Sequence, residues 1–233
     1  MTELVLSDGA NTVVRKLTEK GYKAYAVGGC VRDLLRGRTP DDYDIATSAF
    51  PENVAEVFSA YDVIPTGLKH GTVTVVIDKT PYEITTFRKD GNYPDGRRPE
   101  KVEFVDDLKE DLSRRDFTVN AMAYNDDEGL IDPFGGEQDL KNKILRCVGD
   151  PEKRFTEDAL RILRAARFCS TLSLTAEEET ARKAIKLAYK LKNVSAERIF
   201  TEINKLLLGE NVVGALLKFR KIVFEVIPEL SPC

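Results

Sequence analysis

The sequence has no tryptophan, a single histidine and only four cysteines among its 233 residues. A single histidine, His70, cannot build a zinc site from imidazoles, and a triad that depends on histidine would have to use it. The cysteines form no C-x-x-C pair and match no zinc spacing; they are Cys30, Cys147, Cys169 and Cys233. These absences argue against a zinc module and indicate a chain that stays reduced.

Long apolar runs are also absent, and no stretch is apolar enough over sufficient length to span a bilayer. The N-terminus carries Glu3 and Asp8 and lacks a basic segment followed by an apolar one, so we expect no signal peptide. We therefore expect a cytoplasmic protein without a membrane partner. Its oligomeric state does not follow from the sequence.

Charge is distributed unevenly along a chain whose net charge is −4. Residues 181–233 contain ten Lys and Arg against five Asp and Glu, a net +5, which leaves −9 for the rest. A net acidic chain is no generic nucleic-acid binder, but its basic part could face a polyanion. A solvated face on amphipathic helices explains the same cations equally well.

Hydrophobic periodicity predicts an α+β part followed by a helical part. Strand patterns alternate with helix signals in the first half, and helical segments dominate from Glu157. We expect strands at 23–27, 43–47, 72–78 and 82–88, and helices at 8–20, 51–60, 157–170, 175–191, 196–208 and 211–222. The turn-forming run Gly149-Asp150-Pro151 predicts a boundary between residues 1–149 and residues 150–233.

Two aspartates and a glycine pair form the first candidate site. Asp42 and Asp44 are two residues apart on a predicted strand, so both carboxylates project from one face. Two such carboxylates suit a hard cation such as Mg²⁺. Gly28-Gly29 lies between a strand and a helix, where bare backbone amides can approach a triphosphate. An exposed acidic strand end and an ordinary tight turn are the plainer interpretations.

Glu83 adds a third carboxylate on a neighbouring predicted strand. Strand alternation places it on one face with Thr85 and Phe87, and a glutamate on an inward face needs a partner such as a nearby metal pair. A glutamate on an edge strand in water is an equal alternative.

Arginines recur in two further motifs. In DLSRRDFTVNAMA, Arg115 follows Arg114 before a predicted apolar helix, and a guanidinium suits phosphate. In EDALRILRAARF, charged residues recur every third position, a row that drifts around a helix; they are Asp158, Arg161, Arg164 and Arg167. Helix-stabilising salt bridges are the plainer reading of both motifs.

Taken in order, these motifs make the sequence resemble the class II tRNA nucleotidyltransferase and bacterial poly(A) polymerase family. The resemblance rests on GGCVRD, DYDIAT, RRDFTVNA and EDALRILRAARF, with NVSAERIFTEINKLL (193–207) similar to a helix-capping motif headed by Ser195. It implies a nucleotidyltransferase head, in which helices flank a small mixed β-sheet, followed by a helical neck and the start of a body. The family's chains are longer, so we expect this one to be part of a longer protein.

The resemblance also implies roles for individual residues. Asp42 and Asp44 would bind catalytic Mg²⁺, with Glu83 orienting a ligand or accepting a proton. Gly29, Arg32 and Arg115 would contact the triphosphate or sugar of ATP or CTP, beside Gly28. Asp158 and Arg161 would read the base, and Arg164 and Arg167 would help to hold the nucleotide.

The base-reading role has an independent chemical reason. Cytosine and adenine each present an amine beside an unprotonated ring nitrogen, which fits a carboxylate acceptor next to a guanidinium donor. One such pair could select both nucleotides without a nucleic-acid template, and the resemblance implies addition of CCA to the 3′ end of tRNA. Loop 89–100 resembles one found in family members that add A. Addition of A alone, poly(A) synthesis and a non-catalytic nucleotide- or RNA-binding module are the alternatives.

Overall fold

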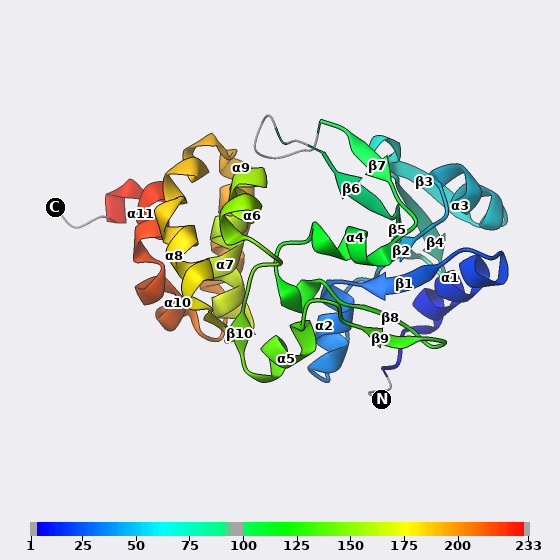
Figure 1. The fold of residues 1–233 in the computed structure, drawn as a ribbon, viewed down its shortest axis with the longest axis horizontal. Helices are drawn as coiled ribbons and strands as arrows, with labels where there is room; N and C mark the ends of the chain where they lie inside the picture. Colours follow the sequence, from blue (N-terminus) through cyan, green and yellow to red (C-terminus); the bar gives the residue numbers. More distant parts are fainter. Residues whose placement is uncertain (1–3, 92, 94–99, 231–233) are drawn as a thin grey trace. The chain divides into compact units, whose positions relative to one another are not determined.

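A computed structural model describes residues 4–91, 93 and 100–230, and the chain divides into two compact units. Unit 1 holds residues 1–90, 102–115 and 119–137, and unit 2 holds residues 91–101, 116–118 and 138–233. The expected α+β class is confirmed, since unit 1 contains a mixed sheet with helices and unit 2 is mainly helical (Figure 1). The functional boundary expected at residue 150 stays a prediction.

In the described part of unit 1, seven strands form one sheet in the order β3-β4-β5-β2-β1-β8-β9. β2 and β5 pair in parallel, and the other neighbours pair antiparallel. The strands are β1 (Ala24–Val27), β2 (Asp44–Thr47), β3 (Asp62–Gly67), β4 (Thr72–Ile77), β5 (Thr80–Thr86), β8 (Ala123–Asn125) and β9 (Gly129–Ile131). A separate antiparallel pair joins β6 (Arg88–Asp90) and β7 (Val102–Phe104).

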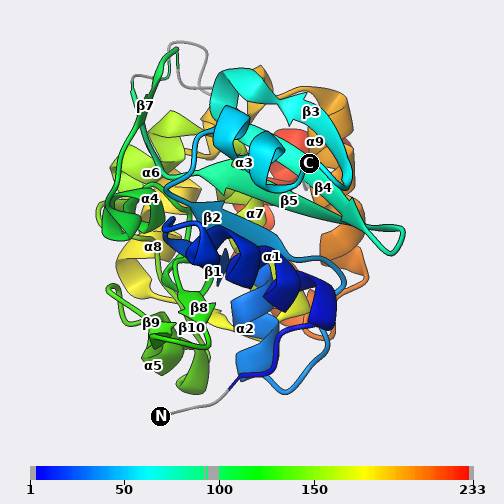
Figure 2. The same ribbon diagram turned by 90° about the vertical axis from the view of Figure 1, so that its right-hand side faces the viewer.

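Helices α1 and α3 cover one face of this sheet (Figure 2). In α1 (Asp8–Glu19) the buried residues Ala10, Val13, Val14 and Leu17 recur at helical spacing, and the Ser7 side chain accepts a hydrogen bond from the Ala10 N–H. These four buried residues of α1 pack with Ile45 and Ile84 of the central strands in one apolar core. The other helices are α2 (Gly29–Leu35), α3 (Pro51–Val57), η1 (Leu68–His70), α4 (Leu108–Ser113), η2 (Thr118–Asn120) and α5 (Gly136–Lys141).

The expected hairpin at 72–88 is present, with a tighter turn than expected. Ile77 pairs with Thr80, so the loop is the two residues Asp78 and Lys79 rather than Lys79-Thr80-Pro81. Both have positive φ, 49° and 66°, as the preferred two-residue hairpin turn requires. This places Glu83 in the middle of β5.

Unit 2 is built around α7 (Leu160–Thr171), which packs against α9 (Ala196–Leu207) and α10 (Val212–Lys218). The Ser170 hydroxyl donates to the Leu206 carbonyl at 2.6 Å and ties α7 to α9. The remaining elements are β10 (Ile144–Leu145), α6 (Pro151–Glu157), β11 (Thr175–Ala176), α8 (Glu178–Lys186), η3 (Ala188–Asn193), α11 (Arg220–Val226) and η4 (Pro228–Leu230).

Several local expectations were wrong. The apolar helix expected after Arg115 is instead the short turn η2 followed by strand β8, and strand β3 was not expected. The helix expected over 157–170 begins three residues later than expected, because α6 ends at Glu157 and α7 begins at Leu160. Of loop 89–100, residue 92 and residues 94–99 lie outside the described residues. No helix in the described part of the chain is long and apolar enough to cross a membrane.

Candidate active site

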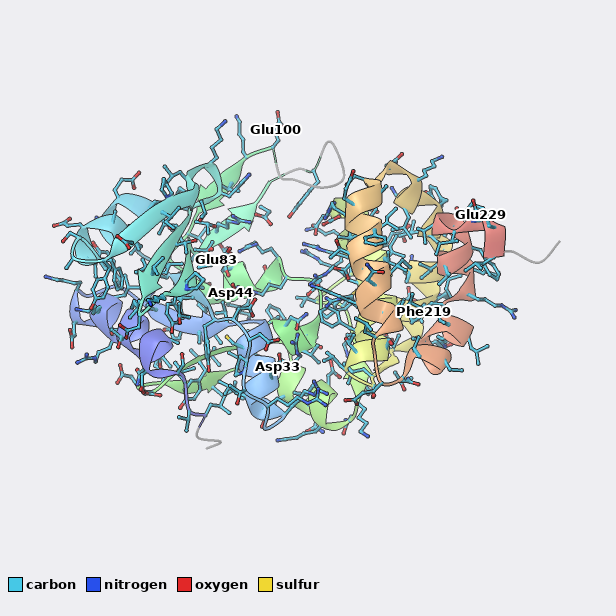
Figure 3. All side chains as sticks on the ribbon, turned by 180° about the vertical axis from the view of Figure 1, so that it is seen from behind. Asp33, Asp44, Glu83, Glu100, Phe219 and Glu229 are labelled. Carbon is cyan, nitrogen blue, oxygen red and sulfur yellow. The ribbon has the colours of Figure 1, made fainter. Side chains whose placement is uncertain are left out.

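The three predicted carboxylates meet in unit 1, at the end of the central strands. Asp44 is the first residue of β2 and is in direct parallel register with Glu83 of β5 (Figure 3). Asp42 precedes it by two residues, and all three side chains are exposed whereas Tyr43 between the aspartates is buried. The expected alternation therefore holds for the aspartates. Glu83, in contrast to the prediction, has an exposed side chain. The buried Phe87 lies beyond the end of β5 and does not share a strand face with Glu83.

Electrostatics make Asp44 the focus of this group. Partial desolvation by the surrounding residues raises the pKa of Asp44, the guanidinium of Arg115 lowers it, and the negative charges of Asp42 and Glu83 raise it further. The net shift of this pKa is upward. Bringing these three carboxylates together costs free energy that Arg115 offsets only in part, and a bound cation would reduce that cost.

The donor set fits a divalent cation held by two carboxylates. Asp42 and Asp44 offer hard oxygen ligands, which Mg²⁺ prefers. In the described part of the chain, however, no group of three or more His, Cys, Asp or Glu is placed to hold a metal ion together. Glu83 is the neighbour of Asp44 in the sheet register.

The glycine pair forms the turn between β1 and α2. Gly28 has a φ of 78°, a conformation that side chains rarely adopt, and its N–H donates to the Met122 carbonyl at 3.1 Å. A Cβ at this position would lie 2.8 Å from an Arg115 nitrogen, so the missing side chain lets that guanidinium approach the turn. Gly29 is the first residue of α2.

Two guanidinium groups at this turn are oriented by neighbours. Arg32 donates to the Asn120 side chain at 2.6 Å and to the Asp33 carboxylate at 2.7 Å. Arg115 lies 3.5 Å from a carboxylate oxygen of Asp111, which is almost fully buried. Arg32 and Arg115, both predicted from the sequence, are thus held in fixed directions within unit 1.

In unit 2, Asp158 occupies the break between α6 and α7. Its backbone is extended, with φ −138° and ψ 107°, and one carboxylate oxygen accepts the Leu160 N–H at 3.0 Å. The other oxygen accepts from Arg198 of α9 at 2.8 Å. Asp158 therefore lies between the two helices instead of within one: its carboxylate accepts the N–H of the first residue of α7 and forms an ion pair with Arg198.

Arg161, in the first turn of α7, is held from the opposite side of the break. Its guanidinium donates to the carboxylate of Glu157 at 2.8 Å, and the same oxygen also accepts from Arg154 at 2.9 Å. The group formed by Arg154, Glu157, Asp158, Arg161 and Arg198 has three cations and two anions. Within unit 2 it is a compact cluster with one excess positive charge.

Arg164 and Arg167 lie farther along α7 and meet two buried carboxylates. Arg164 forms a close pair with Asp116 at 2.6 Å, and Arg167 pairs with Glu202 of α9 at 2.6 Å. Burial lowers the pKa of Arg164, but the carboxylates of Asp116 and Glu202 outweigh it and raise that pKa. The plainer reading of these arginines, as ion pairs that brace helices, is therefore realised in the structure beside any role toward a ligand.

Sequence reasoning missed three residues of this cluster, Arg154, Glu157 and Arg198. Glu157 directly precedes Asp158 in the motif, and Arg198 belongs to the segment that was interpreted only as a helix start. An aspartate before an apolar helical run is a typical N-cap signal, and reading it so would have placed the helix break correctly. The partner Arg198 is 40 residues away in the sequence and could not be found from local pattern.

Comparison with known protein families gives two matches. The model of the Poly A polymerase head domain matches residues 24–146, and that of the probable RNA and SrmB-binding site of polymerase A matches residues 173–232. The first match contains the carboxylates and the glycine turn of unit 1. The second contains Arg198 and Glu202.

Individual relatives resemble most of this chain. The CCA-adding enzyme of Leuconostoc mesenteroides subsp. mesenteroides is 47% identical over 220 residues, which make up 94% of this chain and 54% of that enzyme. The crystal structure of Bacillus stearothermophilus CCA-adding enzyme in complex with CTP superposes with a TM-score of 0.82 at 46% identity, covering 90% of this chain and 50% of that one. Thermotoga maritima CCA-adding enzyme complexed with tRNA_CCA gives a TM-score of 0.81 at 27% identity, and the match covers 99% of this chain and 55% of that one. This chain thus spans about half the length of the relatives it matches.

Proposed function

This chain belongs to the class II tRNA nucleotidyltransferase and poly(A) polymerase family, and we propose that it transfers C and A from CTP and ATP to the 3′ end of tRNA. The observation that carries the proposal is the carboxylate pair Asp42 and Asp44, next to Glu83 and Arg115, with Asp44 paired to the residue that precedes the glycine turn. The similarity to CCA-adding enzymes supports the choice of CCA addition over poly(A) synthesis. We also propose a cytoplasmic setting, because tRNA and nucleoside triphosphates are its substrates.

The proposed chemistry is an in-line displacement in which pyrophosphate leaves. Asp42 and Asp44 would hold Mg²⁺. When bound there, divalent ions lower the pKa of the attacking hydroxyl and neutralise charge on the triphosphate. Arg32 and Arg115 bind the triphosphate, since a planar guanidinium matches phosphate oxygens and both groups are already oriented. The backbone of Gly28-Gly29 allows the phosphates to approach closely.

Glu83 is placed to act on the primer hydroxyl. It lies opposite Asp44 in the sheet register and its side chain is exposed. We propose that it accepts the hydroxyl proton or orients a group at the metal site. As a neighbour rather than a required ligand, it should matter more for the rate of transfer than for metal affinity.

Choice of nucleotide belongs to unit 2 in this proposal. A carboxylate that only accepts hydrogen bonds suits the exocyclic amine of cytosine or adenine, and a guanidinium that only donates suits the adjacent ring nitrogen. Guanine and uracil present a carbonyl and a ring N–H at the same places, which oppose Asp158 and Arg161. Arg164 and Arg167 keep donor capacity beyond their ion pairs, because a guanidinium has five N–H groups.

The test is a primer-extension assay with each substrate in turn. tRNA ending at the discriminator base, at C or at CC is incubated with Mg²⁺ and labelled CTP, ATP, UTP or GTP. We expect C on the first two primers and A only on the last. Runs of A on every primer would indicate poly(A) synthesis instead. A on the CC primer without C on either of the other primers would indicate an A-adding enzyme, and no incorporation on any primer would contradict the proposal.

A further inference from the structure

Arg198 combines an unfavourable position with a specific partner. It lies in the first turn of α9, next to the N-terminal end, where the helix dipole disfavours a cation. Its side chain is 22% exposed and that of Asp158 is 17% exposed, so their contact at 2.8 Å is only partly open to water. An arginine that breaks a local rule in this way points to a role beyond the stability of its own helix.

The scaffold around Arg198 is fixed independently of it. α9 is joined to α7 through Arg167 and Glu202 at 2.6 Å and through Ser170 and the Leu206 carbonyl at 2.6 Å. Arg198 therefore projects from a helix whose position does not depend on its own ion pair. Asp158, in contrast, lies in the two-residue break between helices, where helical packing does not fix its side chain.

Two contacts set the direction of the Asp158 carboxylate. The Leu160 N–H holds one oxygen, and the Arg198 guanidinium holds the other. A carboxylate has about four acceptor positions, so a ligand amine can still bind after both contacts are made. Without Arg198, the carboxylate keeps one anchor and is free to turn about it.

We propose that Arg198 is a positioning residue for nucleotide selection: it orients the Asp158 carboxylate for the amine of cytosine or adenine. This inference rests on the proposed function, in which Asp158 reads the base. Arg198 acts through Asp158 and does not itself touch the base. Arg161 is held separately by Glu157, so the acceptor and the donor of the base-reading pair each have their own holder.

The experiment measures equilibrium binding of CTP, ATP, UTP and GTP, with Mg²⁺, to the full chain and its variants. The variants are Asp158→Ala, Arg198→Met, the double variant, and the control Arg182→Met. Arg182 of α8 pairs with Glu179 at 2.6 Å, and the two side chains are 58% and 44% exposed. It is a suitable control because it is also an arginine paired with a carboxylate, but it is remote from Asp158 in the sequence. Unfolding midpoints and the affinity for inorganic tripolyphosphate, which has no base, are recorded for each variant.

We expect Asp158→Ala to lower the preference for CTP and ATP over UTP and GTP by about tenfold or more, the scale of a hydrogen bond to a charged group. Arg198→Met should lose most of that preference and keep its tripolyphosphate affinity. The double variant should lose no more than Asp158→Ala alone, because both changes remove one interaction. Arg182→Met should match the wild type.

Four results would overturn the inference. If Arg198→Met keeps the wild-type preference while Asp158→Ala loses it, Arg198 does not position the carboxylate, although the proposed function stands. If the double variant loses the product of the two single effects, or if Arg198→Met weakens all four nucleotides equally, the arginine acts directly or only on the fold. If Asp158→Ala itself keeps the preference, the proposed base reading fails together with this inference.

Discussion

Asp44 combines a structural cost with a proposed chemical use. Partial desolvation is the largest cause of its raised pKa, and the charges of Asp42 and Glu83 add to it against the opposing effect of Arg115. The folded chain therefore holds the Asp44 proton to a higher pH than the unfolded chain does. Its ionised form weakens the fold, which is typical of a group retained for binding.

Replacement of Asp44 by asparagine should stabilise the metal-free protein at neutral pH. Because the folded pKa is raised, wild-type stability falls as pH rises from about 3.9, the ordinary aspartate pKa, through the folded-state pKa. Asp44→Asn escapes this loss, so its advantage should grow over that window and then stay constant. Urea unfolding in a chelator at acidic and neutral pH measures it.

Added Mg²⁺ provides the complementary measurement on the same two proteins. A cation that binds only the folded state raises the free energy of unfolding. Wild type should gain stability with Mg²⁺ concentration, whereas Asp44→Asn should gain much less. A variant that is less stable than wild type at neutral pH without metal would contradict the described electrostatics.

Asp111 is the opposite case, a carboxylate that the fold uses. Its burial pushes the pKa of Asp111 upward, but the guanidinium groups of Arg114 and Arg115 outweigh burial, and the net pKa lies below the usual value. Its contribution to stability is therefore fully present above the ordinary aspartate pKa and is lost as pH falls through the lowered folded-state pKa. Through Arg115, it also supports the candidate site.

Asp111→Asn should cost about 3–5 kcal/mol of unfolding free energy at neutral pH, because it removes the buried anion that faces the partly buried guanidinium groups of Arg114 and Arg115. Asp106→Asn is the control, since the pair of Asp106 with Lys23 is largely exposed and should be worth less than about 1 kcal/mol. Urea unfolding of both variants decides the matter. Equal losses would show that the buried network does not hold Arg115 in place.

At the scale of elements, α7 and its neighbours approach closely around Gly209. A Cβ on Gly209 would lie 2.1 Å from the Ser170 hydroxyl and 2.6 Å from a backbone carbon. The glycine that follows α9 thus allows the chain to pass next to α7. Glycine is required at this position because the two backbone segments approach each other closely, and a substitution that adds a single methyl group tests this requirement.

Gly209→Ala should lower the unfolding free energy by about 2–3 kcal/mol through overpacking. Gly135→Ala is the comparison, because Gly135 has a φ of 74° and nothing near its missing Cβ. It should cost about 1 kcal/mol from backbone conformation alone. Thermal or urea unfolding gives both values, and a smaller loss at Gly209 than at Gly135 would contradict the described packing of α7.

Elements with strong periodicity were predictable from the sequence, and short ones were not. Helix α1 shows apolar residues at helical spacing, and the β4–β5 hairpin shows alternating apolar residues. The bounds of both matched the predicted bounds within a few residues. Strands of three residues, such as β8 and β9, are too short to show a period. The break at Asp158 was missed because the apolar spacing continues across it, while the aspartate side chain competes for the helix backbone.

At the scale of the whole molecule, the sequence placed candidate residues in both units but did not reveal their partners. The pairing of Asp44 with Glu83 depends on strand order, and that of Asp158 with Arg198 joins residues 40 positions apart. Such contacts are set by tertiary packing. The charge asymmetry between the basic residues 181–233 and the acidic remainder could be read directly from the sequence, and the proposed metal site belongs to the acidic part.

The central claim is that Asp42 and Asp44 hold the metal for nucleotidyl transfer. Asp41 is an adjacent exposed aspartate and provides a matched control. The measurement is the initial rate of CMP incorporation into tRNA that lacks its CCA end, with Mg²⁺, for wild type and for Asp41→Asn, Asp42→Asn and Asp44→Asn. We predict that Asp41→Asn keeps the wild-type rate and that the other two fall by about a thousandfold or more, since several kcal/mol of charge stabilisation are lost. Near-normal incorporation by Asp42→Asn or Asp44→Asn would contradict the account.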